Sequence, residues 1–180
     1  MKKTIILFSV ILLSFTAAKS QTSIPVQFQE LVHKLSQEVP DQDKKSAINA
    51  SPNRLLEFAR SMLGIRYRSA SSSPSKGFDC SGFVNYVFSN FGFKVPRSSR
   101  EFATSGEAKK LEDAKIGDVI LFTGTNSRSR TPGHVGIIYS IDGDEIKFIH
   151  SSSGKKRGVT ITSLDDGFYK KRFIKVISIL

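Results

Sequence analysis

The pattern of hydrophobic and polar positions changes along the chain from a helical period to an alternating one. Apolar residues recur at helical spacing in residues 52–64 and 79–91, which predicts two helices. Five later segments are rich in β-branched residues and are separated by Gly, Asp and Ser, which predicts strands at 118–122, 134–141, 145–150, 158–162 and 172–180. Helices followed by a run of strands predict an α+β domain, with N-terminal helices packed on an antiparallel β-sheet.

The two predicted helices carry signals at their ends. Ser51 and Pro52 suit the cap and first turn of the first helix, and Gly64 suits its end. Asp79 is placed to cap the second helix. The apolar stripe of that helix contains Cys80, Val84, Val87, Phe88 and Phe91. The thiol is therefore expected in the first helical turn, directed toward whatever packs on the helix.

The first twenty residues have the composition of a secretory signal. Lys2 and Lys3 precede an apolar run, and Ala18-Lys19-Ser20 offers the small residues that a signal peptidase recognises. The run is short for a membrane span, which needs about 20 apolar residues. Residues 1–20 therefore predict a cleaved signal peptide, with an uncleaved anchor as the alternative.

The rest of the chain divides into two parts. Residues 21–50 are polar and too few for a second core, so they predict an N-terminal extension or linker. Residues 51–180 have a globular composition and predict one domain. The mature protein is expected to be exported to the periplasm or the extracellular side of the cell envelope, as a monomer without stable membrane insertion.

The chain is basic, with a net charge of +11 at pH 7. Loss of residues 1–20 would remove three lysines and no acidic residue, which leaves +8. Such a charge favours anionic surroundings, for example a cell wall or lipid head groups. No RNP-type, zinc-finger or helix-turn-helix pattern accompanies it, so scattered solvated cations are favoured over a nucleic-acid site.

The chain contains a single cysteine, Cys80. Small exported domains usually carry cysteines in even numbers, as disulfides. One cysteine alone is either a buried structural residue or a thiol kept for its reactivity. The first turn of a helix favours the second interpretation, because the helix dipole stabilises a thiolate and unpaired backbone N–H groups can bind an oxyanion.

A nucleophilic thiol needs a base, and the chain has three histidines. His33 lies in the polar extension, which favours a solvated role. His134 begins a predicted strand after a flexible basic segment, and His150 ends the next strand. Either histidine alone would be interpreted as structural. Together, facing one helical thiol, they predict a base and a residue that orients it.

Two other chemistries are less well supported. A zinc site could use Cys80 with His134 and His150, but close ligand pairs such as Cys-x2-Cys or His-x3-His are absent. A serine nucleophile lacks the Gly-x-Ser-x-Gly pattern. No metal and no cofactor are therefore expected.

Strand parity restricts how the histidines can cooperate. Side chains alternate between the two faces of a strand, so His134 and His150 must project from the same face. A two-residue Asp-Gly turn would place His150 opposite Val135 and split the pair. An odd-length turn or a compensating bulge would place it opposite Gly136, where the missing side chain leaves room for an imidazole. We predict such a turn or bulge, with both histidines on the sheet face that the Cys80 helix covers.

Four segments together resemble the NlpC/P60 cysteine peptidases: GFDCSGFVNYVF, VPRSSREFA, AKIGDVILF and PGHVGIIYS with FIHSSS. The resemblance runs from about Leu55 to Leu180. It implies a papain-like α+β fold. It also implies hydrolysis of amide bonds in peptidoglycan stem peptides, commonly the bond between D-glutamate and the following diamino acid.

The resemblance assigns roles to individual residues. Cys80 matches the nucleophile, His134 the general base, and His150 the polar third residue that orients the base. The expected mechanism uses a thiolate–imidazolium pair.

Three further residues match positions around the nucleophile. Asp79 and Ser81 match residues that line the stem-peptide pocket, and Tyr67 matches a tyrosine whose hydroxyl helps to hold the oxyanion. The chain departs from the family where many relatives follow that tyrosine with x-Trp-Gly-Gly, because Arg68 to Ser71 read RSAS. Two alternatives stay open: an amidase or acyltransferase on the same scaffold that acts on a non-peptidoglycan substrate, and a non-catalytic cell-wall-binding module.

Overall fold

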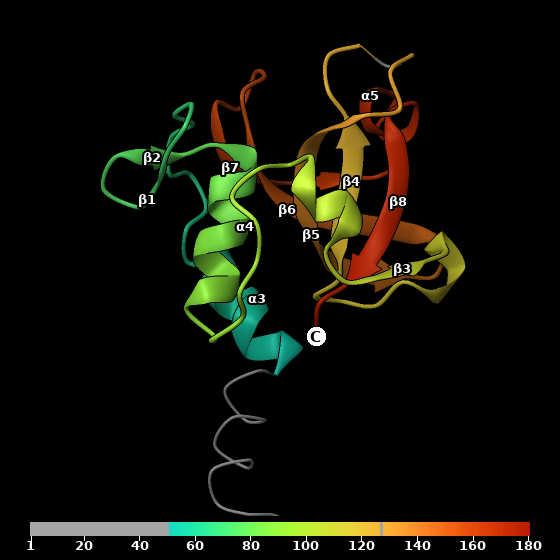
Figure 1. Ribbon diagram of the computed structural model, residues 1–180, viewed down its shortest axis with the longest axis horizontal. Helices are drawn as coiled ribbons and strands as arrows, with labels where there is room; N and C mark the ends of the chain where they lie inside the picture. Colours follow the sequence, from blue (N-terminus) through green and yellow to red (C-terminus); the bar gives the residue numbers. More distant parts are fainter. Residues whose placement is uncertain (1–50, 127) are drawn as a thin grey trace, which may run out of the picture. The chain divides into compact units, whose positions relative to one another are not determined.

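The structure is a computed structural model that describes residues 51–126 and 128–180 (Figure 1). The predicted signal peptide and the extension with His33 lie outside the described residues. Two helices come first, α3 (Pro52–Arg60) and α4 (Cys80–Ser89), with the short strands β1 (Ser72–Ser73) and β2 (Gly77–Phe78) between them. No helix in the described ranges is both long enough and apolar enough to cross a membrane.

The remaining elements build a six-stranded sheet. Its strands are β3 (Glu107–Lys109), β4 (Val119–Thr123), β5 (Pro132–Asp142), β6 (Glu145–Ser152), β7 (Gly158–Ser163) and β8 (Phe173–Ser178). Three short helices accompany them: η1 (Glu101–Thr104) precedes β3, η2 (Leu111–Asp113) follows β3, and α5 (Gly167–Lys170) precedes β8. The strand order is β3-β8-β4-β5-β6-β7 and every neighbouring pair is antiparallel. The predicted α+β architecture is confirmed.

The ends of the two helices differ in how they are capped. Ser51 makes no side-chain cap bond to α3, which starts with Pro52 in its first turn and ends at Arg60. Asp79 caps α4 as predicted, because its carboxylate accepts a hydrogen bond from the Gly82 N–H at 2.7 Å. The cap fixes Cys80 as the first residue of α4.

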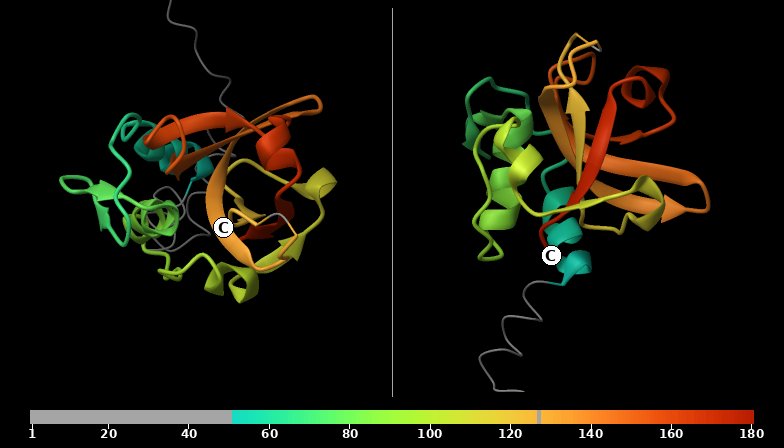
Figure 2. Two further views of the ribbon diagram at one scale, coloured as in Figure 1. Left: turned by 90° about the horizontal axis from the view of Figure 1, so that it is seen from above. Right: turned by 45° about the vertical axis from the view of Figure 1, so that its right-hand side comes forward.

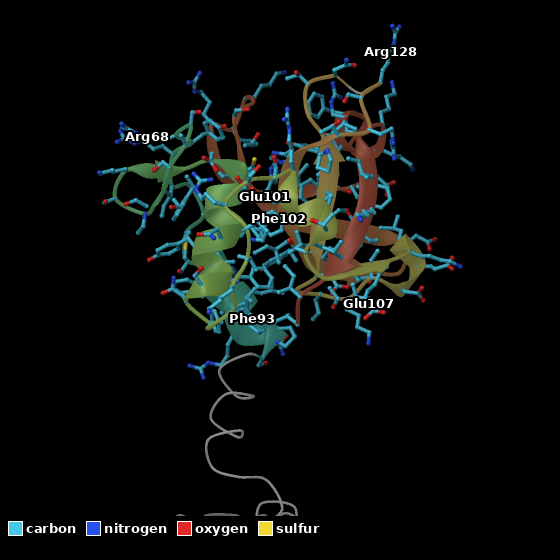
Figure 3. The ribbon with its side chains drawn as sticks, in the orientation of Figure 1. Arg68, Phe93, Glu101, Phe102, Glu107 and Arg128 are labelled. Carbon is cyan, nitrogen blue, oxygen red and sulfur yellow. The ribbon has the colours of Figure 1, made fainter. Side chains whose placement is uncertain are left out.

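Alternation along the strands gives the sheet two apolar faces. One face packs on α3 and α4 and forms the helix-side core, which contains Phe83, Val84, Val87, Leu121, Val135, Ile137 and Ile149. The other face forms the far-side core, which contains Ile120, Phe122, Ile138, Phe148, Leu164 and Val176. Figure 2 shows that the sheet curls on itself and that α4 lies outside the curl.

The hairpin between β5 and β6 contains the predicted irregularity. Asp142 opposes Glu145, so the turn has two residues, and a bulge at Tyr139 shifts the register before Ile138 opposes Phe148. The next pair is Ile137 with Ile149, which brings Gly136 beside His150. A Cβ added to Gly136 would lie 3.2 Å from the His150 Cβ. The compensating bulge and the neighbouring glycine are both confirmed.

Candidate active site

The thiol of Cys80 lies where the start of α4 meets the start of β5. Its Sγ atom is 4.0 Å from the carbonyl oxygen of Gly133, the residue before His134. The side chain is partly buried and packs against the helix-side core. The N–H groups of Cys80, Ser81 and Val135 point at the sulfur and favour its ionised form. The predicted position of Cys80 in the first helical turn is confirmed.

The carboxylate of Asp79 is saturated by hydrogen bonds. One oxygen accepts from the Gly82 N–H and from Arg97 Nη1 at 2.9 Å, and the other accepts from Arg97 Nη2 at 2.6 Å and from the Ser71 N–H at 3.0 Å. This two-pronged Arg–carboxylate pair is the strong form of a charge-assisted bond. Asp79 therefore fixes the helix start, and its predicted role in lining the substrate pocket stays a prediction.

Ser81 belongs to the same network, since its hydroxyl lies 3.3 Å from Asp79 and 3.1 Å from Arg97 Nη1. The sequence assigned no role to Arg97, although it lies in the VPRSSREFA segment. The signal that could have indicated a cation is the acidic cap Asp79, because a carboxylate that becomes buried at a helix start needs a cation nearby. We describe Cys80, Asp79, Ser81 and Arg97 together as the thiol side of the site.

The RSAS segment, which departs from the family pattern, packs against the thiol side. Ser71 is buried, its N–H donates to Asp79, and its hydroxyl donates to the Gly77 carbonyl at 2.6 Å. A Cβ on Gly82 would lie 2.2 Å from the Ser71 carbonyl oxygen, so the segment needs a glycine in the first turn of α4. Ala70 adopts a positive φ of 54° to make this approach.

The two histidines form a hydrogen-bonded chain. His134 Nε2 lies 2.9 Å from His150 Nδ1, and His150 Nε2 lies 3.0 Å from the hydroxyl of Thr162. For His134 to accept a proton at Nδ1, its Nε2–H must donate to His150, and His150 must then donate to Thr162. Thr162 was not singled out from the sequence, because its place on β7 depends on long-range pairing. His134, His150 and Thr162 make up the imidazole side of the site.

The parity prediction is confirmed in one part and wrong in another. His134 and His150 share a face, but it is the face of the far-side core and not the one that α4 covers. The rings of His134 and His150 pack on Phe122, Phe148 and Tyr169, with centroids 4.7–5.9 Å apart. The reason is that α4 begins beside the start of β5, so the thiol contacts the strand backbone and does not lie over the sheet face.

Burial sets the protonation of the reactive pair. It raises the pKa of the Cys80 thiol, and the negative charge of Asp79 raises it further. Burial among aromatic rings lowers the pKa of His134 to about 4 and holds that of His150 well below its usual value. Burial therefore opposes the expected thiolate–imidazolium pair and favours a neutral thiol beside a neutral imidazole, and the ion pair stays a prediction. The helix-end N–H groups act in the predicted direction but do not outweigh burial.

Tyr67 lies within electrostatic range of the thiol. Burial raises the pKa of its hydroxyl, the charges of a Cys80 thiolate and of Asp79 raise it further, and Arg97 opposes them. The hydroxyl thus stays protonated and can donate a hydrogen bond. Its backbone N–H donates to the Arg157 carbonyl at 2.8 Å, which ties the tyrosine to the loop before β7.

The described residues contain no group of three or more His, Cys, Asp or Glu side chains arranged to hold a metal ion. His134 and His150 instead direct a nitrogen at each other. The geometry suits acid–base chemistry with a thiol nucleophile.

Comparison with known proteins decides the family. The NlpC/P60 family model matches residues 64–178. The chain belongs to the NlpC/P60 family. The match covers all six site residues predicted from the sequence. It begins after α3, so that helix lies outside the matched segment.

Relatives and solved structures agree with this assignment. The murein DD-endopeptidase MepS/murein LD-carboxypeptidase of Escherichia coli (strain K12) is 34% identical over 123 residues, which cover 67% of this chain and 59% of that protein. The gamma-DL-glutamyl hydrolase of Bacillus subtilis (strain 168) is 33% identical over 121 residues, 67% of this chain and 28% of that protein. The crystal structure of an NlpC/P60 family protein from Bacillus cereus has a TM-score of 0.64 at 29% identity, covering 72% of this chain and 40% of that one. The chain thus spans less than two thirds of these relatives.

Proposed function

We propose that the protein is an exported cysteine peptidase that hydrolyses amide bonds in peptidoglycan stem peptides. The observation that carries the proposal is the joint placement of Cys80 at the start of α4 and of the hydrogen-bonded His134–His150 pair beside it. The names of the relatives support peptidoglycan and γ-glutamyl amides as the substrate class. The D-glutamyl to diamino acid bond is the one that we expect to be cut.

The mechanism starts from the neutral pair. His134 Nδ1 accepts the thiol proton as the sulfur of Cys80 attacks the amide carbonyl, so charge develops only during the reaction. The N–H groups at the start of α4 and the protonated hydroxyl of Tyr67 stabilise the oxyanion. His134 then gives its proton to the leaving amine, and a water molecule activated by His134 hydrolyses the thioester to release the acid.

Digestion of purified peptidoglycan tests this function directly. The wild-type protein is expected to release fragments whose masses identify the bond that is cut, while Cys80→Ala releases none. A non-catalytic wall-binding module would bind the wall equally well in both forms and release nothing. An amidase or acyltransferase for another substrate would leave the wall intact and still react rapidly with a thiol-directed reagent. Release of the same fragments by Cys80→Ala would refute the cysteine-peptidase mechanism.

A further inference from the structure

A cavity of about 290 Å³ opens beside His134, on the side of the imidazole away from the helix-side core. Its walls come from four segments: the end of β4, the start of β5, the end of β6 with the following loop, and α5 with Arg172. Ligand pockets commonly measure about 300–1,000 Å³, so this cavity suits a group of amino-acid size better than a disaccharide.

The position of the cavity relates it to one half of the substrate. Gly133 and His134 line it, whereas Cys80 and Tyr67 do not. In the mechanism proposed above, His134 protonates the leaving amine, while the acyl half stays on the sulfur. A cavity walled by the imidazole is therefore suited to the leaving half of the substrate.

The charge of the cavity comes from one side chain. Its lining includes no Asp or Glu, and its only permanently charged residue is Arg172. The ion pairs found among the described residues do not include Arg172. A fixed cation without an acidic partner attracts an anionic group.

The guanidinium of Arg172 is held in place by neutral groups. Its Nε donates to the Gly124 carbonyl at 3.2 Å, Nη2 to the Thr125 carbonyl at 3.0 Å, and Nη1 to the Phe168 carbonyl at 3.1 Å. Its central carbon lies 3.7 Å from the centroid of the Phe168 ring. These contacts use three of its five N–H groups and leave one on each Nη nitrogen that can donate to a carboxylate.

We propose that this cavity binds the leaving amino acid of the substrate and that Arg172 pairs with a free α-carboxylate on it. The proposal rests on the proposed function and narrows it, because it names the substrate class as peptides cut in front of a residue with an ionised carboxyl group. Arg172 then acts as a specificity determinant and takes no part in the chemical step.

Two matched peptides test the proposal. Both carry a γ-D-glutamyl bond to a diamino acid, with the α-carboxyl group of that residue free in one and present as a carboxamide in the other. Hydrogen bonds to charged groups are strong enough for the wild type to prefer the free carboxylate by about 10- to 100-fold in kcat/KM. Arg172→Gln is expected to reduce this ratio to about one, mainly by slowing the carboxylate peptide.

Lys171→Gln is the matched control, because it removes the same charge from the neighbouring exposed residue, which does not line the cavity. It should keep the wild-type ratio. Because the ratio compares two substrates on one protein preparation, it does not depend on how much of a variant is folded.

The outcomes separate this proposal from the proposed function. Equal rates for the two peptides in the wild type, or a preference that survives in Arg172→Gln, would overturn the role of Arg172. Wall hydrolysis without cleavage of the carboxylate peptide would also overturn it. Failure to cleave either peptide or the wall would count against the proposed function itself, and the inference would fall with it.

Discussion

The thiol side and the imidazole side of the site are positioned by opposite kinds of interaction. On the thiol side, the charged pair of Arg97 and Asp79 holds the start of α4. On the imidazole side, neutral hydrogen bonds and aromatic rings hold His134 and His150. Both environments nevertheless oppose charge on the reactive atoms, since burial raises the pKa of Cys80 and lowers that of His134. A charged pair can therefore hold the start of α4 without making the neighbouring thiol charged, so helix capping and the resting charge of the thiol are separate properties of this site.

The largest effect is expected from removing the nucleophile. Cys80→Ala should lower peptidoglycan hydrolysis by at least about a thousandfold, because a methyl group cannot attack a carbonyl carbon. Its thermal unfolding temperature should stay close to that of the wild type, since the helix cap does not involve the sulfur. Iodoacetamide should inactivate the wild type and modify Cys80 alone. An alanine variant that keeps most of its activity would rule out Cys80 as the nucleophile.

The next largest effects separate the two histidines. His134→Ala should slow the reaction by about 10²- to 10⁴-fold, the usual contribution of general acid–base catalysis. His150→Ala should cost less, about 10- to 100-fold, because it removes the group that orients the base and spares the base itself. Steady-state rates on one stem-peptide substrate would test the order. Equal losses in both variants would mean that His150 does more than orient His134.

The pH dependence tests whether the resting pair is neutral. With a pKa of about 4, His134 is uncharged near neutral pH and able to accept the thiol proton. Activity should therefore persist in mildly acidic solution and fall as the pH drops through about 4, where the imidazole becomes protonated. In the absence of substrate, the alkylation rate of Cys80 should rise with pH up to and beyond the usual thiol pKa of about 8.5. A plateau of fast alkylation in mildly acidic solution would instead establish a thiolate–imidazolium pair.

A smaller effect is expected from the ion pair on the thiol side. Arg97→Gln leaves the buried Asp79 carboxylate with the Ser71 and Gly82 N–H groups but without its cation, which should cost about 1–3 kcal/mol of stability. The loss of a positive charge near the sulfur should also slow alkylation of Cys80 at a fixed pH. Arg100→Gln, a change at a nearby exposed arginine, is the control. A variant that alkylates as fast as the wild type would show that Arg97 acts on the fold alone.

The sequence predicted the thiol side better than the imidazole side, because helix signals are local. The cap at Asp79 and the first-turn position of Cys80 follow from residues within one turn of each other. The sheet face of His134 and the role of Thr162 depend on the pairing of β5, β6 and β7, which no local pattern encodes. The short strand β3 and the helix α5 were also missed, because segments of three or four residues carry too little periodicity to be predicted.

The effect of burial on the pKa values of Cys80 and His134 could not be predicted from the sequence either. The helix dipole is visible in the position of Cys80, and it favours a thiolate. Burial opposes this effect, and it depends on β5 and on the aromatic rings that the curled sheet brings around His134. The capping carboxylate of Asp79 indicated that a cation lies nearby, but which cation could not be predicted, because Arg97 is eighteen residues from Asp79 in the chain and meets it only in the folded protein.

The last effect, similar in size to that of Arg97→Gln, is expected from the imidazole side, at the glycine that makes room for His150. A methyl group at Gly136 would lie 2.8 Å from the Phe148 ring and 3.2 Å from the His150 Cβ, so those buried side chains must shift. Gly136→Ala should therefore cost about 1–3 kcal/mol of stability, the range for overpacking a core. If the shift moves His150, it should also lower activity, by less than His150→Ala does.

Gly143→Asn is the matched control, because Gly143 has a φ of +57°, open space around it, and a conformation that asparagine tolerates. Urea unfolding and steady-state rates of both variants would measure the two effects. A stable and fully active Gly136→Ala protein would show that the packing around His150 accepts a methyl group and that the imidazole side does not need a glycine there.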